Sequence, residues 1–186
     1  MAHKYYVMLG NLTITPNTML VPVKAYGKPY PTEPISSILA FCSGMPQFFG
    51  GTYKGSSGII PFLQRKVSEE SRNTLELMNT FPADTHILEE TDKNGDDYKY
   101  YWANKTYWQP TPTKWGSAST AEEAEMDRIV EVDLSKFVGL DRYHSIQQLY
   151  EQTVSEKGPG SKEFVGSLTC EAFLKLILLY QQGKLL

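Results

Sequence analysis

The sequence contains few of the residues from which metal sites and disulfide scaffolds are built. Its 186 residues include two cysteines, Cys42 and Cys170, and three histidines. Two cysteines are too few for a disulfide framework, and neither Cys-x-x-Cys nor His-x-x-x-His spacing is present. We therefore expect no metal site and no cofactor, while the sequence leaves open whether the two cysteines pair.

Long apolar segments are also missing. No stretch approaches the roughly 18 apolar residues of a membrane-spanning helix, and the first residues lack the apolar core of a secretion signal. These features predict a cytoplasmic protein that does not cross a membrane. The formal net charge of −3 gives little support to a chain that binds nucleic acid by neutralising phosphates, so nucleic acid is not an expected partner.

The glycine-rich segment between Gly50 and Gly58 matches the phosphate-loop pattern only in part. Gly50 and Gly55 have the required spacing, but Ser56 occupies the position of the lysine that binds the β- and γ-phosphates. The simpler interpretation is a turned loop. The alternative is a cradle of backbone amides for another anion, with Gly51, Lys54, Gly55 and Ser56 as its candidate residues.

A second segment, which starts at Asp92, begins like a calcium-binding loop, with oxygen donors at its first, third and fifth positions. The glycine required at the sixth position is Asp97, and the bidentate glutamate required at the twelfth is Ala103. A polar hairpin turn around Asn94-Gly95 is therefore the better interpretation.

Acidic side chains cluster around Glu123 and Glu125. Two neighbouring carboxyls can act as acid and base in hydrolysis when one is protonated and the other is ionised. Solvated surface acids are the simpler interpretation, because adjacent charges usually face water. An enzyme on a phosphorylated or sugar substrate, which uses the Gly50–Gly58 loop and these acids, is thus an alternative hypothesis.

Aromatic residues are what the chain has in plenty, and all three tryptophans lie between residues 102 and 115. On a strand, Tyr100 and Trp102 point to one face and Tyr101 points to the other, because side chains alternate. Both faces then carry rings. Burial of both faces inside one domain is one interpretation, and a partner surface is the other. The candidate partner-binding residues are Tyr101, Trp102, Tyr107, Trp108 and Trp115.

The pattern of apolar residues and turns predicts strands at 4–9, 19–26, 86–91, 97–102, 106–109 and 128–134. Pro22 within the second of these predicts an edge strand or a bulge. The strands at 86–91 and 97–102 should form a hairpin with a type I′ turn. The glycine-rich residues 43–58 should form a loop.

Helices are predicted at 35–42, at 68–80 with Ser68 as its cap, from a capping box of Ser145 and Gln148, and at 169–182. A short helix or a loop is expected within 117–127. The last helix is apolar almost all round, which predicts either a core helix or a helix with a second buried face.

These patterns predict one α+β domain over residues 1–186, in which an antiparallel sheet with a central aromatic hairpin is packed by three to four helices. The main functional hypothesis is a non-enzymatic binding or assembly protein that contacts a protein partner or its own copies through the aromatic residues. The enzyme described above and a single-stranded nucleic-acid binder are the alternatives.

Overall fold

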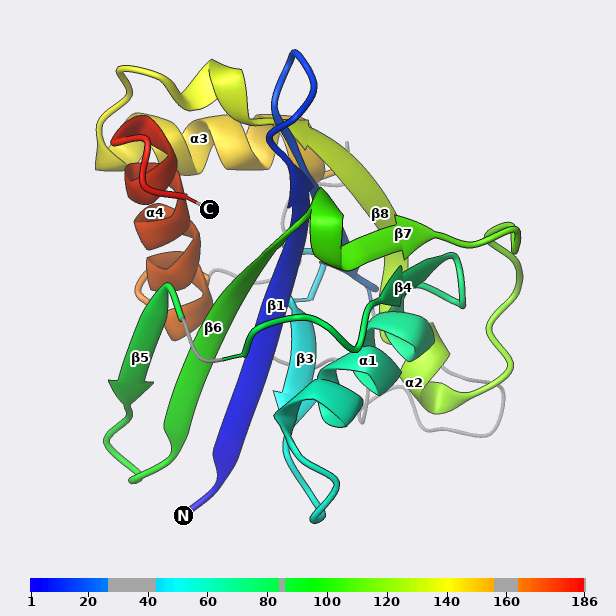
Figure 1. Cartoon of the computed structure of the whole chain (residues 1–186). Helices are drawn as coiled ribbons and strands as arrows, with labels where there is room; N and C mark the ends of the chain where they lie inside the picture. The colour runs from blue at the N-terminus through cyan, green and yellow to red at the C-terminus, as the bar shows by residue number, and fades with distance from the viewer. Residues whose placement is uncertain (27–42, 84–85, 156–163, 186) are drawn as a thin grey trace.

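The computed structural model describes residues 1–26, 43–83, 86–155 and 164–185. It confirms the predicted α+β fold, with a six-stranded sheet between helices (Figure 1). The strands of this sheet are β1 (His3–Asn11), β2 (Thr18–Lys24), β3 (Phe49–Thr52), β5 (Leu88–Thr91), β6 (Asp97–Asn104) and β8 (Met126–Asp133). A second, two-stranded sheet contains β4 (Leu75–Leu77) and β7 (Trp108–Pro110). The helices are α1 (Ile59–Glu70), α2 (Ala121–Ala124), α3 (Arg142–Thr153) and α4 (Leu168–Gln181).

The main sheet is mixed, although most of its strand pairs are antiparallel as predicted. Its order is β5-β6-β1-β2-β8, and the central pair of β1 and β6 is parallel. A parallel pair needs a long connection between its strands, and here residues 12–96 form that connection. The sequence prediction of an antiparallel sheet missed this pair because a parallel neighbour leaves no turn between the two strands.

The sheet divides along β1. Leu9 to Asn11 pair with β2, whereas Lys4 to Val7 pair with β3 on the same side of the strand. Strand β2 continues beside β8 and has a register shift between Val23 and Lys24. The predicted bulge near Pro22 is therefore present, but β2 is an interior strand. We call the place where β3 lies between β1 and the end of β2 the fork.

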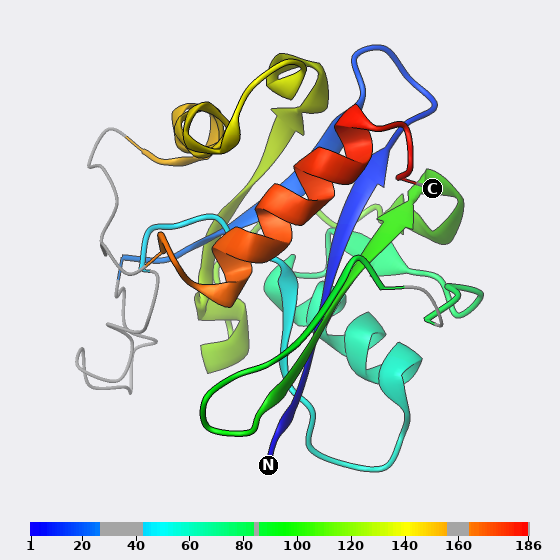
Figure 2. The same cartoon turned by 90° about the vertical axis from the view of Figure 1, so that its left-hand side faces the viewer.

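Two apolar cores lie on opposite faces of the sheet. Met8, Tyr100 and Phe173 belong to the core under α3 and α4, and Figure 2 shows α4 crossing this face. Val7, Tyr101 and Phe62 belong to the core under α1. Side chains of one strand thus enter both cores in alternation, which is why the aromatic strand β6 carries rings on both faces.

Helix α1 corrects the sequence prediction. The helix spans residues 59–70, not 68–80. Pro61 lies in its first turn, where a backbone amide has no partner within the helix, so a proline costs no hydrogen bond. It ends before Arg72 and Asn73, whose φ angles of 51° and 62° are left-handed. Leu75 and Leu77 then alternate as a strand. The apolar spacing that suggested a helix here came from a strand and the turn after it.

The hairpin of β5 and β6 is confirmed, but its turn is not type I′. Asp92 accepts a hydrogen bond from the Gly95 amide at 3.0 Å, and Gly95 alone has a positive φ, of 83°. This is the pattern of a type I turn followed by a left-handed glycine. The Asp92 side chain accepts the Asn94 and Asp96 amides at 2.8 and 3.0 Å, so the predicted polar turn is confirmed.

The remaining elements follow the sequence with shifts. Helix α3 begins after Asp141, whose side chain accepts the His144 amide, so the predicted capping box at Ser145 lies inside the helix. Helix α4 is confirmed, with Ser167 as its N-cap and Gly183 beyond its end. The strand predicted at 106–109 is β7, which pairs with β4 outside the main sheet.

Three further predictions can be compared with the structure. The glycine-rich residues 43–58, predicted as a loop, contain β3. The helix predicted at 35–42 and Cys42 lie outside the described residues, whereas Cys170 is buried and free. In the described part of the chain, no helix is both long and apolar enough to span a bilayer. A cytoplasmic location stays a prediction.

Candidate functional site

A buried carboxyl at the end of α1 lies at the fork. Glu70 is 1% exposed, and its Oε1 accepts a hydrogen bond from the Gly50 amide of β3 at 2.9 Å. Glycine is required at position 50, because a Cβ there would lie 2.1 Å from the carbonyl oxygen of Tyr5. The close approach of β3 to β1 therefore directs this amide to the carboxyl.

A second carboxyl joins the first. This is Glu125, just before β8, whose side chain interacts with that of Glu70 and contributes to the rise of its pKa. Burial, followed by the charge of Glu125, raises the pKa of Glu70 well above its ordinary value, against the opposing effects of the Gly50 amide and Lys66. Glu125 itself is exposed. The site thus combines a buried, protonated carboxyl with an accessible one.

A lysine on α1 brings positive charge to the same place. Lys66 is largely buried, and its Nζ lies 3.9 Å from Glu69, which also faces Arg65 at 3.9 Å. A Cβ built on Gly51 would lie 3.6 Å from this Nζ. The ammonium group therefore lies over the bare backbone of β3, near enough to Glu70 to oppose the rise of its pKa.

Tyr6 lines a cavity on the α4 side of the sheet, and the described lining of this cavity includes neither Glu70 nor Glu125. The Tyr6 ring stacks on Tyr100, with ring centroids 4.9 Å apart. Burial is the main reason why the pKa of Tyr6 lies well above its ordinary value. Tyr100 and Tyr98 raise it further, and the charges of Glu70 and Glu125 make the smallest contributions. The cavity has a volume of about 680 Å³, and its lining includes Lys4, Tyr6, Lys24, Gln47, Lys93 and Tyr98.

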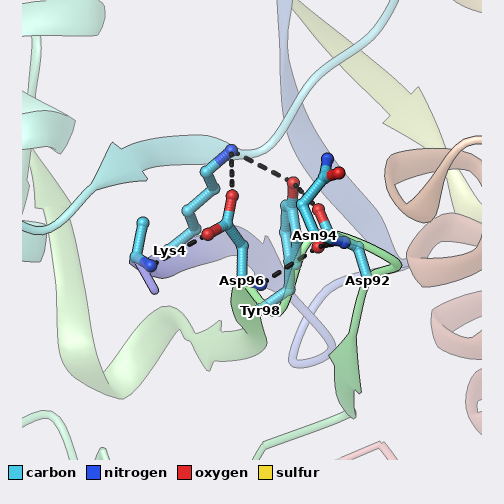
Figure 3. Close-up of polar contacts among 6 residues, drawn as sticks. Lys4, Asp92, Asn94, Asp96 and Tyr98 are labelled. Atoms are coloured by element: carbon cyan, nitrogen blue, oxygen red, sulfur yellow. Dashed lines mark hydrogen bonds and ion pairs between the residues drawn. The ribbon is translucent and has the colours of Figure 1, made fainter.

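Asp92, Lys93 and Tyr98 of the hairpin line one side of this cavity, and Figure 3 shows the polar contacts around Tyr98. Lys4 donates a hydrogen bond to the Tyr98 hydroxyl at 3.1 Å, and that hydroxyl donates to Asp92 at 3.2 Å. The Lys4 Nζ also lies 3.8 Å from Asp96. The Tyr98 hydrogen bond is the main reason why the pKa of Lys4 is raised. Tyr98 and Asp96 thus partner the Lys4 ammonium group. Lys24 and Lys93, which also line the cavity, form no ion pair with the described residues.

A metal ion has limited support from the side chains present. Among the described residues, no three His, Cys, Asp or Glu side chains converge to ligate one. Two carboxylates can hold Mg²⁺ when substrate phosphates and waters complete its shell. Glu70 and Glu125 are the pair that fits this description, and a cation there would require both carboxyls to be ionised.

Comparisons with known proteins bear on the fold. No family model and no curated protein matches the chain. The crystal structure of an ADP compounds hydrolase matches with a TM-score of 0.50 at 11% sequence identity, over 97% of this chain and 75% of that chain. A NUDIX hydrolase from Nitrosomonas europaea matches with a TM-score of 0.48 and 11% identity, over 98% and 90% of the two chains. The E. coli ORF135 protein has a TM-score of 0.43 and 12% identity, over 95% and 90%. The chain shares its fold with the ADP compounds hydrolase.

The main functional hypothesis from the sequence is wrong. Tyr101, Trp102 and Trp108 are between 1% and 7% exposed and fill the chain's own cores, and Tyr107 packs against the core under α1. Trp115 is 36% exposed, but the Arg72 guanidinium covers its ring at 4.3 Å. A protein-binding homo-oligomer built on these rings is contradicted, because most of the rings fill the chain's own cores and the fold is shared with the ADP compounds hydrolase. The enzyme alternative agrees better with these findings.

The candidate anion-binding residues are divided by the structure. Gly51 lies in β3 beside Lys66, within the site. Lys54, Gly55 and Ser56 lie exposed in the loop between β3 and α1. Anion binding by these four residues stays a prediction.

The acid pair considered from the sequence is also divided. Glu123 accepts hydrogen bonds from the hydroxyls of Ser119 and Thr120, and Thr120 is the N-cap of α2. Glu125 reaches Glu70 instead. Sequence reasoning missed Glu70 and Lys66 because it placed the start of a helix at Ser68, in the middle of α1. The signal that could have identified them is a helix that begins after the glycine-rich loop, at Gly58, and ends in the acidic residues Glu69 and Glu70.

Proposed function

We propose that the chain is a hydrolase that acts on a phosphorylated small molecule. The proposal depends on one observation, the buried Glu70 carboxyl that accepts the Gly50 amide, with Lys66 and the exposed Glu125 near enough to shift its pKa. Neighbouring groups whose surroundings separate their protonation states are typical of acid–base sites. The fold shared with the ADP compounds hydrolase supports the same class of reaction.

Each charged residue of the site has a role in this reaction. Glu125 accepts the proton of an attacking water, whose oxygen bonds to phosphorus while the bond to the leaving oxygen breaks and its electron pair departs with that oxygen. Glu70 keeps its own proton beside Glu125. Lys66 and Lys24 place positive charge near the phosphoryl oxygens. A divalent cation bound together with the substrate would supply further positive charge.

A sugar substrate has less support. Glycosidases keep their two carboxyls roughly 5 Å or more apart, so that a sugar ring or a water fits between them. The side chains of Glu70 and Glu125 instead lie close enough to interact directly. The lysines that line the adjoining cavity also suit a phosphorylated substrate better than a neutral one.

The test is a panel of ADP-linked compounds, nucleoside di- and triphosphates and sugar phosphates, incubated with and without Mg²⁺ and analysed by ³¹P NMR. We expect the wild-type chain to hydrolyse at least one class. Glu125→Gln should lower kcat by roughly 100-fold or more, because an amide cannot accept the proton.

Glu123→Gln is the matched control, since Glu123 lies two residues before Glu125 and its carboxylate binds the hydroxyls of Ser119 and Thr120. Its kcat should stay close to wild type. Absence of turnover across the panel, or equal losses in the two variants, would contradict the proposal.

A further inference from the structure

Arg72, two residues after Glu70, binds the backbone of the segment that carries Glu125. Arg72 donates hydrogen bonds from Nε to the Glu123 carbonyl at 3.2 Å, from Nη2 to the Met126 carbonyl at 2.9 Å and from Nη1 to the Gly116 carbonyl at 2.7 Å. Backbone groups on both sides of Glu125 are thus held by one guanidinium group.

Three further contacts attach the connection between β7 and α2 to the turn after α1. The guanidinium carbon lies 4.3 Å from the centre of the Trp115 ring, a cation–π contact. The Thr111 amide donates to the Thr74 carbonyl at 2.9 Å, and the Thr111 hydroxyl donates to the Asn73 carbonyl. In Figure 1 the long connection from β7 to α2 runs beside α1 and β4, where these contacts lie.

The backbone at this position is arranged for the contact. Arg72 and Asn73 have left-handed φ angles of 51° and 62°; asparagine tolerates this region, whereas arginine adopts it only at a cost that the surroundings must offset. The Asn73 amide donates to the Ser68 carbonyl at 2.8 Å and closes the end of the helix. The Arg72 side chain is thereby fixed only two residues from Glu70.

We infer that Arg72 is a positioning residue, which holds the segment from Trp115 to Met126 so that Glu125 stays against Glu70. This inference depends on the proposed hydrolase function, because its purpose is to keep the carboxyl pair together. Arg72 itself touches no substrate in this account. Its planar, five-donor head group suits three separate carbonyls, which a lysine could not bind at once.

The test compares Arg72→Ala and Arg72→Lys with Arg142→Ala as the matched control. Arg142 pairs with Glu171 between α3 and α4, away from Glu125, and its side chain is 57% exposed. We expect Arg72→Ala to lower kcat by about 10- to 100-fold with little change in KM, because a small misplacement of a reacting group is costly. Arg72→Lys should fall in between, and Arg142→Ala should keep its kcat.

Chemical rescue separates positioning from a general loss of stability. Guanidinium chloride, far below unfolding concentrations, should restore part of the kcat of Arg72→Ala and none of that of Arg72→Lys, whose side chain fills the space. An Arg72→Ala variant with wild-type kcat, or one that is no more rescued than Arg142→Ala, would overturn the inference.

Two readouts do not need activity. Removal of Arg72 uncovers Trp115, so tryptophan emission should shift to longer wavelength and become easier to quench with acrylamide, and Trp115→Phe should abolish this change. Amide exchange should rise in residues 116–126. If no substrate in the panel is hydrolysed, the proposed function fails. Unchanged tryptophan emission and amide exchange in Arg72→Ala would overturn the positioning role of Arg72, whether or not a substrate is found.

Discussion

At the scale of single residues, the unusual feature is Glu70, a buried carboxyl whose pKa rises on folding. Glu70 combines burial with the neighbouring charge of Glu125, and the Gly50 amide and Lys66 oppose them without prevailing. The folded chain therefore keeps a proton that the unfolded chain would release above the ordinary pKa of about 4.5. The unfolded state binds fewer protons in this range, so stability falls as pH rises from there to the raised pKa.

Glu70→Gln should remove this loss of stability. The amide stays neutral, its oxygen can accept the Gly50 amide, and its NH₂ group can donate to Glu125. Urea unfolding should show that the variant gains over wild type from about pH 4.5 upward, until the folded pKa of Glu70 is passed. Glu69→Gln, at a partly exposed neighbour between two cations, should show no comparable gain. A Glu70→Gln chain less stable than wild type at neutral pH would contradict this explanation.

Adjacent glycines in β3 offer a second comparison at this scale. Gly50→Ala would place a Cβ 2.1 Å from the Tyr5 carbonyl and 2.7 Å from the Cα of Tyr6, so β3 would have to move. We expect a loss of about 1–3 kcal/mol or more in the free energy of unfolding. Gly51→Ala meets only Lys66 atoms at 3.5 and 3.6 Å, an ordinary contact. Its loss, by the same urea titration, should stay within about 0.5 kcal/mol, and equal losses would refute the argument.

At the scale of elements, the hairpin depends on one glycine. No atom lies within 4 Å of a Cβ built on Gly95, so a substitution there acts through its φ of 83° alone. Gly95→Ala should cost roughly 1 kcal/mol and raise amide hydrogen exchange in β5 and in the β6 residues that pair with it.

Gly139 provides the control, because it has a φ of 78° and equally open surroundings but lies between Leu134–Phe137 and α3. Gly139→Ala should cost a similar amount and leave β5 exchange unchanged. If the two variants have the same exchange pattern, the turn does not control the hairpin.

Elements with a regular pattern could be predicted from the sequence, and those defined by context could not. Alternation identified β1, β2 and β8, and the apolar run from Phe173 identified α4. Helix α1 was misplaced because Leu75 and Leu77 fit a helix and a strand alike, and the left-handed residues that separate them from the helix are arginine and asparagine, not glycine. The parallel pairing of β1 with β6 leaves no local signal at all.

The site was the least predictable part for the same reason. Glu70 and Glu125 come from segments that the fold alone brings together, across β3 and the end of β2. Sequence reasoning did identify Glu125 and Gly51, but with other neighbours. The number of aromatic residues in β6 suggested a partner-binding surface, because one face of a strand could not bury all the rings. Two cores on opposite faces of the sheet bury them instead.

At the scale of the whole molecule, the two cores share one sheet and should unfold together. Phe62 and Phe173 are buried on opposite faces. Truncation of either to alanine should cost about 3–5 kcal/mol.

In both variants a single urea transition should persist, with coincident curves from tryptophan emission and circular dichroism. Val138→Ala, at a residue that is 64% exposed, is the control and should have little effect. Two separated transitions in either phenylalanine variant would show that the cores are independent units.

The alternation of β1 makes chemically identical neighbours non-equivalent. Tyr5 faces Tyr53 and Phe62 beneath α1, whereas Tyr6 faces Tyr98 and Tyr100 beside the cavity. One residue inserted before Tyr5 would exchange these environments along the strand's first half. Tyr6 would then turn from the cavity toward α1, so a single inserted residue should disturb this strand more than a conservative substitution within it.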